Sequence, residues 1–315
     1  MFPERRHTVA MRKNRSLVLK SWLQPIVGVV AMLVLVASAT AQTPAASGNE
    51  SNASALLEKH AALAAQLVKN SFRRPLFLES TETTNKVSGS AYAVLDSPLS
   101  TVSSSFKSPR LWCEVLILHL NTKYCHAGID ASPSTVEVAI GKKTPQAVAD
   151  AFAFAFAYRV AAASSSYLTV QLNADKGPLS TNDYRIELQA VPLPDGKTFM
   201  HLRYSYGYGI AGRLAMQTYL ATLGSGKVGF TQIKEGEKLA YVGGMRGTVE
   251  RNTMRYYLAI EAYLASLSQP PAQQFEARLG YWFDATEEYP QQLHEVDRSS
   301  YFSMKKDEYQ RQKSE

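Results

Sequence analysis

Cysteine is scarce in this sequence, with two residues among 315, and no apolar run reaches the ~20 residues that a membrane-spanning helix needs. Glycine (18) and proline (14) are too few for a collagen-like chain. Charged residues make up 19% and apolar residues 45%, which argues against disorder and against a multi-span membrane protein. The composition therefore predicts an ordinary foldable chain.

The net charge of +7 is concentrated at the start of the chain. Residues 1–41 contain one acidic residue, Glu4, and six basic ones: Arg5, Arg6, Arg12, Lys13, Arg15 and Lys20. This segment carries +5 of the +7, which leaves +2 for the remaining chain. Such a small balance is not the basic footprint of a nucleic-acid-binding protein, so we predict no nucleic-acid partner.

The same segment has the layout of a secretory signal peptide. An apolar run at Ile26–Val36 follows the basic residues, and small residues ending in Ala39-Thr40-Ala41 follow the run. We predict a signal peptide at 1–41, cleaved near Ala41, and a mature protein in the periplasm or secreted. The alternative is an uncleaved anchor helix, for which an apolar run of about 11 residues is short.

Export favours a disulfide between Cys113 and Cys125 over two free thiols. A catalytic pair of Cys113 with His119 is disfavoured, because a spacing of six turns the two side chains to different faces of a helix. No short-spaced set of ligands predicts a metal site. Gly207–Gly212 has the spacing of a dinucleotide-binding loop but lacks the βαβ context, so we predict no cofactor and assign no catalytic residue.

Five segments follow from composition and periodicity. We predict the signal peptide at 1–41, a flexible polar linker at 42–54, an amphipathic helix at 55–75, a main domain at 76–268 and a charged helical tail at 269–315. The tail carries interspersed aromatic residues. We expect it to wrap back onto the domain, although binding to a partner or to a membrane surface is the alternative.

Within the main domain, the period of the apolar residues changes along the chain. We predict one long or two short strands at 76–95, and then two short helices that begin at Ser97-Pro98 and Ser108-Pro109. Alternating strands then continue to residue 208, with hairpin turns at 194–196 and 235–237. Finally, we predict helices at 210–223 and 246–267, the second preceded by Gly243-Gly244.

This order of elements resembles the helix-grip fold of the START-like (SRPBCC) superfamily over residues 76–268. The residues that carry the resemblance are Val87–Leu95, Ser97-Pro98, Ser108-Pro109 and the segment Val242-Gly243-Gly244-Met245-Arg246-Gly247 before the long helix. The WC…LILHLNTKYC segment and the RGTVERNTMRYYLAIEAYL helix are similar to those of an exported, poorly characterised bacterial branch. The resemblance implies an α+β fold in which a curved antiparallel sheet grips a long C-terminal helix, here with an added N-terminal helix and a helical C-terminal tail.

Members of this superfamily hold an apolar ligand between the sheet and the long helix. The resemblance therefore implies that certain aromatic residues contact the ligand and that certain polar residues orient its head group. The candidates are Trp112, His119, Phe154, Arg159, Arg203, Tyr204, Tyr206 and Glu250. Each has a plainer interpretation. Tyrosines on one strand face often only pack, and Glu250, Arg251 and Arg255 have the spacing of helix-surface ion pairs.

We therefore predict an exported binding protein for a lipid or another hydrophobic small molecule. One alternative is a cyclase- or hydrolase-like enzyme that uses a Tyr, His119 or Glu250 in the same cavity as acid or base. A second is an interaction protein that acts through its tail. A transient membrane-surface contact stays open, and the sequence identifies no protein partner.

Overall fold

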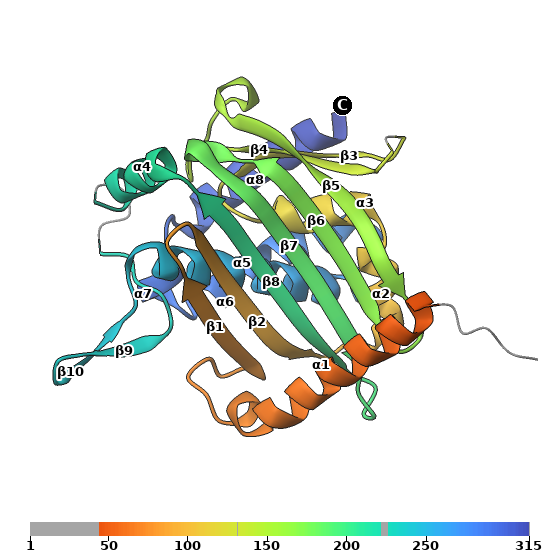
Figure 1. The fold of residues 1–315 in the computed structure, drawn as a ribbon. Coiled ribbons are helices and arrows are strands. Elements are labelled where there is room, and N and C mark those ends of the chain that lie inside the picture. Colours follow the sequence, from red (N-terminus) through yellow and green to blue (C-terminus); the bar gives the residue numbers. More distant parts are fainter. Residues whose placement is uncertain (1–43, 131, 222–225, 315) are drawn as a thin grey trace, which may run out of the picture. The chain divides into compact units, whose positions relative to one another are not determined.

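The computed structural model describes residues 44–130, 132–221 and 226–314. The predicted signal peptide lies outside these residues. Eight strands form one antiparallel sheet in the order β1-β2-β8-β7-β6-β5-β4-β3 (Figure 1). The strands are β1 (Leu76–Glu82), β2 (Lys86–Leu95), β3 (Thr122–Gly128), β4 (Thr135–Ile140), β5 (Phe152–Ala163), β6 (Leu168–Lys176), β7 (Thr181–Pro192) and β8 (Thr198–Tyr208).

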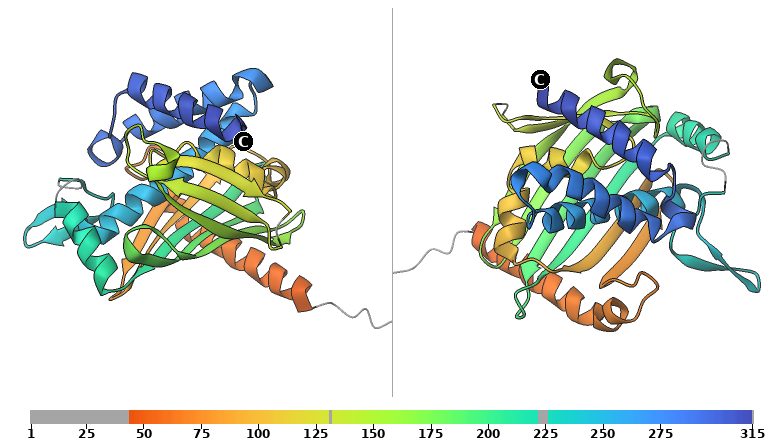
Figure 2. Two further views of the ribbon diagram at one scale, coloured as in Figure 1. Left: turned by 90° about the horizontal axis from the view of Figure 1, so that it is seen from above. Right: turned by 180° about the vertical axis from the view of Figure 1, so that it is seen from behind.

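The long helix α5 (Gly244–Ser266) lies across one face of this sheet, as Figures 1 and 2 show. It packs on β1, β2 and β8, and the short helices α2 (Leu99–Phe106) and α3 (Pro109–Leu116) cover the same face. This is the predicted α+β helix-grip arrangement, which the structure confirms. A curved antiparallel sheet can enclose one helix in this way because its strands alternate inward and outward side chains.

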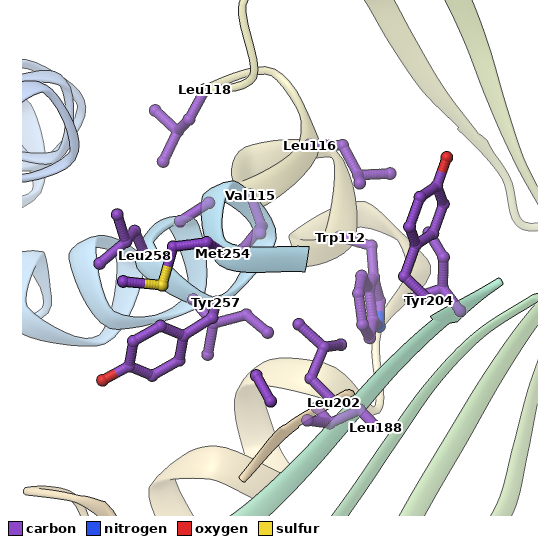
Figure 3. Close-up of a cluster of buried hydrophobic side chains, with 14 of the residues drawn as sticks. Trp112, Val115, Leu116, Leu118, Leu188, Leu202, Tyr204, Met254, Tyr257 and Leu258 are labelled. Carbon is purple, nitrogen blue, oxygen red and sulfur yellow. The ribbon is translucent and has the colours of Figure 1, made fainter. Parts of the chain in front are cut away.

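Buried apolar side chains fill part of the space between the sheet and α5. Figure 3 shows Trp112 and Val115 of α3 packed with Leu202 of β8 and with Met254 and Leu258 of α5. These side chains are almost completely buried. Burial of each such side chain contributes roughly 1.5–3 kcal/mol, so this region fixes α3 and α5 on the sheet.

The opposite face of the sheet is covered at one end by helix α1 (Pro44–Val68). Ala53, Leu56, Leu63 and Leu67 are buried there in a second core with Phe199 of β8 and neighbouring sheet residues. The prediction of a flexible linker at 42–54 was wrong from Pro44 onward. Ala53 already packs on the sheet, and this contact stabilises a helical turn that polar composition alone did not predict.

Other predicted boundaries differ in detail. The segment predicted as one helix at 55–75 ends at Val68. Helix α4 spans Ile210–Ala221, and the last two positions of the helix predicted at 210–223 lie outside the described residues. Ser108 is the N-cap of α3, with Pro109 at its first position, whereas Pro98 itself occupies the N-cap of α2. Neither cap makes a side-chain hydrogen bond, so the fixed φ of proline sets these helix starts.

Two predicted turns and the disulfide are confirmed. The β7–β8 hairpin turns at Gly196, which has a φ of 78°. A small second sheet pairs β9 (Gln232–Glu235) with β10 (Lys238–Tyr241) across Gly236, whose φ is 64°. Cys113 and Cys125 form a disulfide with their Cα atoms 5.3 Å apart, which links α3 to β3.

The C-terminal tail packs back onto the domain. It forms α6 (Gln274–Glu287), α7 (Pro290–Leu293) and α8 (Arg298–Ser314). Helix α6 covers the side of α5 that faces away from the sheet, and α8 packs on β3 (Figure 2). The rings of Trp282 and Tyr301 stack at 5.0 Å, both buried. Among the described residues, no helix combines the length and apolarity needed to cross a membrane.

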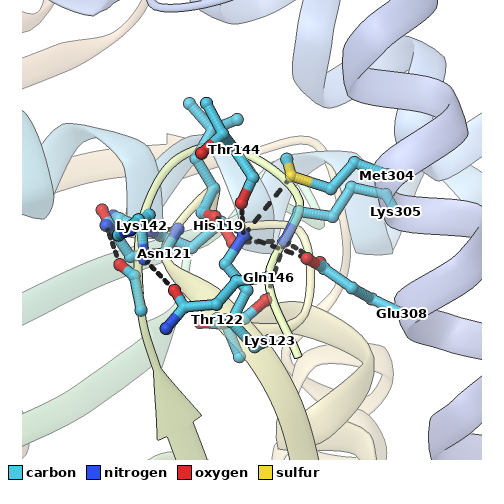
Figure 4. A network of polar contacts seen from close by, with 12 residues as sticks. His119, Asn121, Thr122, Lys123, Lys142, Thr144, Gln146, Met304, Lys305 and Glu308 are labelled. Atoms are coloured by element: carbon cyan, nitrogen blue, oxygen red, sulfur yellow. Dashed lines mark hydrogen bonds and ion pairs between the residues drawn. The ribbon is translucent and has the colours of Figure 1, made fainter. Parts of the chain in front are cut away.

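A buried polar network joins α8 to the domain (Figure 4). The carboxylate of Glu308 binds Lys305 at 2.6 Å and Lys123 of β3 at 3.0 Å. All three side chains are at most 1% exposed. Two ammonium groups therefore share one carboxylate here, and they complete their hydrogen bonding on backbone carbonyl oxygens of the domain.

Candidate functional site

A cavity of about 730 Å³ lies between the inner face of the sheet and the first half of α5. It occupies the end of the domain where β5 and β7 begin and β8 ends. The 3-10 turn η2 (Pro178–Ser180), helix α4 and the chain between β4 and β5 complete its walls. The cavity has one aromatic wall and one polar wall.

The aromatic wall is built by strand alternation. Phe152, Phe154 and Phe156 of β5 share one face, and so do Tyr204 and Tyr206 of β8. Tyr184 of β7 lies among them: its ring stacks on that of Tyr206 at 5.2 Å and lies 5.8 Å from that of Phe154. Burial raises the pKa of Tyr184 to about 12, so its hydroxyl stays neutral in a region of low polarity.

The polar wall comes mainly from α5, where Arg251, Asn252 and Arg255 face the cavity. Nη2 of Arg255 lies 2.8 Å from Oε1 of Glu295, and Nζ of Lys143 lies 2.6 Å from the same oxygen. Burial alone would raise the pKa of Glu295, but Arg255 and Lys143 hold it below its usual value. This carboxylate is therefore ionised and binds cations from two different parts of the chain.

His119 lies at the edge of this polar wall. Its ring centroid is 5.2 Å from that of Tyr256, and its Nδ1 accepts a hydrogen bond of 3.2 Å from the backbone N–H of Asn121. Burial, followed by repulsion from Arg255, Lys305 and Lys143, holds its pKa well below 6.5, so the ring is neutral. Nε2 has no hydrogen-bond partner within the part of the chain that the structure describes.

The disulfide holds this part of the wall. Leu116, His119, Asn121 and Thr122 all line the cavity, and all lie in the loop that the bridge closes. Short loops tied at both ends have few alternative conformations. The bridge therefore restricts the conformations of the cavity residues of this loop.

The opposite rim contains a strained turn. Leu179 and Ser180 of η2 have φ values of 56° and 58°, in the left-handed region that non-glycine residues seldom adopt. Gly212 of α4 packs so closely on this turn that an added Cβ would lie 2.8 Å from the carbonyl oxygen of Ser180. Leu179 lines the cavity and is half exposed, which makes it part of the entrance.

Four of the eight predicted ligand residues line the cavity: His119, Phe154, Tyr204 and Tyr206. The structure brings these together from the α3–β3 connection, β5 and β8. The other four do not line it. Trp112 is a core residue, 1% exposed, whose Nε1 donates a hydrogen bond to the carbonyl oxygen of Phe106.

Arg159 and Arg203 are exposed on the outer face of the sheet. Each lies an odd number of positions from the cavity residues on its own strand, so its side chain points the other way. Nε of Arg203 donates to Oγ of Ser88 at 3.2 Å. The assignment of these two arginines to the cavity was wrong.

Glu250 is completely buried but turned away from the cavity. Its carboxylate accepts hydrogen bonds from the backbone N–H groups of Phe230 and Thr231 at 2.6 and 2.9 Å, and from the hydroxyls of Ser80 and Thr231 at 2.5 and 2.7 Å. It anchors the segment before β9 to α5. Its assignment as a ligand or acid-base residue was therefore wrong.

Sequence reasoning missed Arg255, Lys143 and Glu295. Arg251 and Arg255 are only 4% and 2% exposed, so their interpretation as helix-surface pairs was also wrong. The spacing of four between Arg251 and Arg255 places both on one helix face, but no sequence pattern indicates that this face lines a cavity. No group of three potential metal ligands occurs among the described residues.

Comparisons with known proteins assign no family to this chain. No family model and no curated protein matches this chain. Among solved structures, norcoclaurine synthase from Thalictrum flavum, in complex with dopamine and hydroxybenzaldehyde, matches with 9% identity and a TM-score of 0.31, covering 47% of this chain and 82% of that one. Human StAR-related lipid transfer protein 5 matches with 11% identity and a TM-score of 0.29, covering 56% and 90%. These values assign neither a ligand nor an activity to this chain.

Proposed function

We propose that the protein binds a lipid or another hydrophobic small molecule in the cavity between the sheet and α5. The observation that carries this proposal is the aromatic wall, which lines a space of about 730 Å³ instead of filling it. This volume is within the range of ~300–1,000 Å³ that is typical of small-molecule sites. Displacement of water from this apolar surface by a ligand is favourable in free energy, because apolar surface is removed from water.

Native mass spectrometry of the protein purified from its own compartment tests the proposal. We expect a co-purified molecule at one copy per chain, released under denaturing conditions. Uptake of the uncharged probe 1-N-phenylnaphthylamine, whose fluorescence rises in apolar surroundings, should follow removal of that molecule. A protein that carries no ligand and fails to take up the probe would contradict the proposal.

A second candidate function is an enzyme of the cyclase or hydrolase kind, and one observation favours it. His119 is neutral and lines the cavity, and because its Nδ1 accepts a hydrogen bond from Asn121, Nε2 carries the ring proton and can donate it to a bound molecule. Chemical change of the bound molecule on incubation, lost in His119→Gln but with binding retained, would support this candidate. An unchanged ligand supports binding alone.

We also propose that the protein works outside the cytoplasm, on the basis of the basic and apolar pattern of residues 1–41. N-terminal sequencing of the mature protein tests this, and we expect it to start at Gln42. A mature chain that retains residues 1–41 would contradict cleavage.

A further inference from the structure

The polar wall of the cavity carries more positive than negative charge. Glu295 binds Arg255 at 2.8 Å, Lys143 at 2.6 Å and, more loosely, Lys227 at 3.8 Å. Three cations thus share one carboxylate. The other acidic residue that lines the cavity, Asp150, is exposed at the edge.

These charges are withdrawn from water. The side chains of Arg255 and Glu295 are 3% and 9% exposed, and that of Lys143 is 22% exposed. An excess of buried positive charge is unfavourable unless an anion balances it, because water no longer screens the repulsion. Glu295 contributes one negative charge to a group with three positive charges, so the group has a net charge of +2.

The pKa values of neighbouring bases reflect the same field. Burial and then repulsion by Arg255 lower the pKa of Lys143, although Glu295 opposes this effect. Burial lowers the pKa of Lys227; Glu295 opposes this effect, and the positive charges of Lys143, Arg255 and Arg251 lower the pKa further. The wall therefore presents a positive potential to whatever occupies the cavity.

The arrangement also has the donors that an oxyanion needs. Arg251 and Arg255 lie one helical turn apart and line the same side of the cavity, with Asn252 between them. Guanidinium groups bind carboxylate and phosphate groups through paired hydrogen bonds. The aromatic wall, in contrast, offers mainly ring surfaces.

We propose that the polar wall is an anion subsite, in which Arg255 and Lys143, with Arg251 and His119 beside them, bind the oxyanion head group of an amphiphile. The apolar part of that ligand lies on the aromatic wall. This inference rests on the proposed function and narrows it to ligands with a carboxylate, phosphate or sulfate at one end. The two walls then have separate roles, since the aromatic one supplies burial and the basic one sets orientation.

A competition series tests the subsite. Laurate, dodecyl phosphate, dodecanol and dodecyltrimethylammonium share one alkyl chain and differ only in head group, and each is added below its micelle concentration to protein loaded with 1-N-phenylnaphthylamine. We expect laurate or dodecyl phosphate to displace the probe at about tenfold lower concentration than dodecanol, because a charge-assisted hydrogen bond contributes at least this much. The cationic compound should compete worst.

Two substitutions should act in opposite directions. Lys143→Gln removes one cation and should weaken the binding of laurate and dodecyl phosphate several-fold, while the binding of dodecanol stays unchanged. Glu295→Gln removes the carboxylate and should strengthen the binding of the two anions relative to that of dodecanol. Lys197→Gln, at the distant β7–β8 turn, is the matched control and should change neither. Unchanged dodecanol binding shows in each case that the cavity is intact.

The outcomes separate the two proposals. If dodecanol competes as well as laurate and dodecyl phosphate, the anion subsite is overturned and the hydrophobic cavity stands. If no member of the series binds and the probe does not enter, both proposals fail together. Inorganic phosphate distinguishes a free anion from a head group: displacement at the same concentration as dodecyl phosphate would overturn the assignment to an amphiphile.

Discussion

Lys305, in the last helix of the chain, donates a hydrogen bond of 2.7 Å to the carbonyl oxygen of His119 at the wall of the cavity. The same ammonium group donates to the carbonyl oxygen of Thr122 at 2.8 Å. Lys123 donates to the carbonyl oxygen of Thr144, on the neighbouring loop, at 3.0 Å. Thus α8 binds one backbone segment of the cavity directly through Lys305, and it holds Lys123, which binds a second segment, through Glu308.

Removal of the carboxylate in this network should destabilise the protein strongly. Glu308→Gln leaves the ammonium groups of Lys123 and Lys305 buried together without their shared anion, which typically costs ~3–5 kcal/mol. We expect urea unfolding to report a loss of this size. Glu276→Gln removes a carboxylate from an exposed pair with Lys306 and should cost under ~1 kcal/mol. Equal stability of the two variants would contradict a structural role of the network.

Ligand binding should depend on the inner face of β5 and not on its outer face. Phe154→Ala removes one ring of the aromatic wall and should weaken the binding of 1-N-phenylnaphthylamine about two- to tenfold, since such contacts contribute ~0.5–1.5 kcal/mol. Arg159→Ala, five positions along the same strand, is the control and should leave binding unchanged. Fluorescence titration measures both. Weaker binding in Arg159→Ala and unchanged binding in Phe154→Ala would place the site on the outer face of the sheet and contradict the proposed cavity.

Stability at acid pH should depend on His201. Burial, followed by repulsion from Arg203 and Lys59, lowers the pKa of His201 to about 4. The unfolded chain binds a proton at about pH 6.5 and the folded chain only near pH 4, so the free energy of unfolding falls as the pH falls through this window. His201→Gln should reduce that slope by up to ~1.4 kcal/mol per pH unit.

Thermal or urea unfolding at several pH values checks this prediction. The exposed His126 supplies the control, His126→Gln, which should keep the wild-type slope. The same slope in wild type and His201→Gln would show that His201 does not titrate with folding. In the folded protein, His201 stacks on Tyr92 with ring centroids 4.2 Å apart.

Loss of the disulfide should affect both stability and binding. The double substitution Cys113→Ser with Cys125→Ser opens a short loop and should lower the free energy of unfolding by about 3 kcal/mol. Because His119 and Asn121 lie within that loop, ligand affinity should fall as well. Denaturant unfolding and probe titration, with and without reductant on the wild type, measure the two effects. Unchanged affinity after reduction would show that the loop does not need the bridge to line the cavity.

Much of the fold was predictable because local patterns determine it. Proline fixes the starts of α2 and α3, Gly196 permits the β7–β8 turn, and strict alternation on β5 and β8 put Phe154 with its neighbours on one face. The same alternation could have excluded Arg159 and Arg203, because their positions differ by odd numbers from those of the aromatic residues.

The polar wall was not predictable in this way. Lys143 lies on a loop, Arg255 on a helix covered on both sides, and Glu295 in the tail, so no local pattern relates them. Since α6 buries the side of α5 that would otherwise face solvent, charged residues on α5 no longer mark a surface. The start of α1 was missed because its helical state depends on contact with the sheet rather than on its own composition.

Helix α1 covers the ends of β5 and β7 and the start of β8, whereas the cavity lies against the opposite ends of these strands. At the end of the sheet that α1 covers, both faces carry packed side chains. At the end that borders the cavity, α1 does not cover the outer face. Distortion of the first residues of β5 would therefore disturb no second core. We therefore expect a bulky ligand to displace the first residues of β5 while the packed end of the sheet keeps its structure.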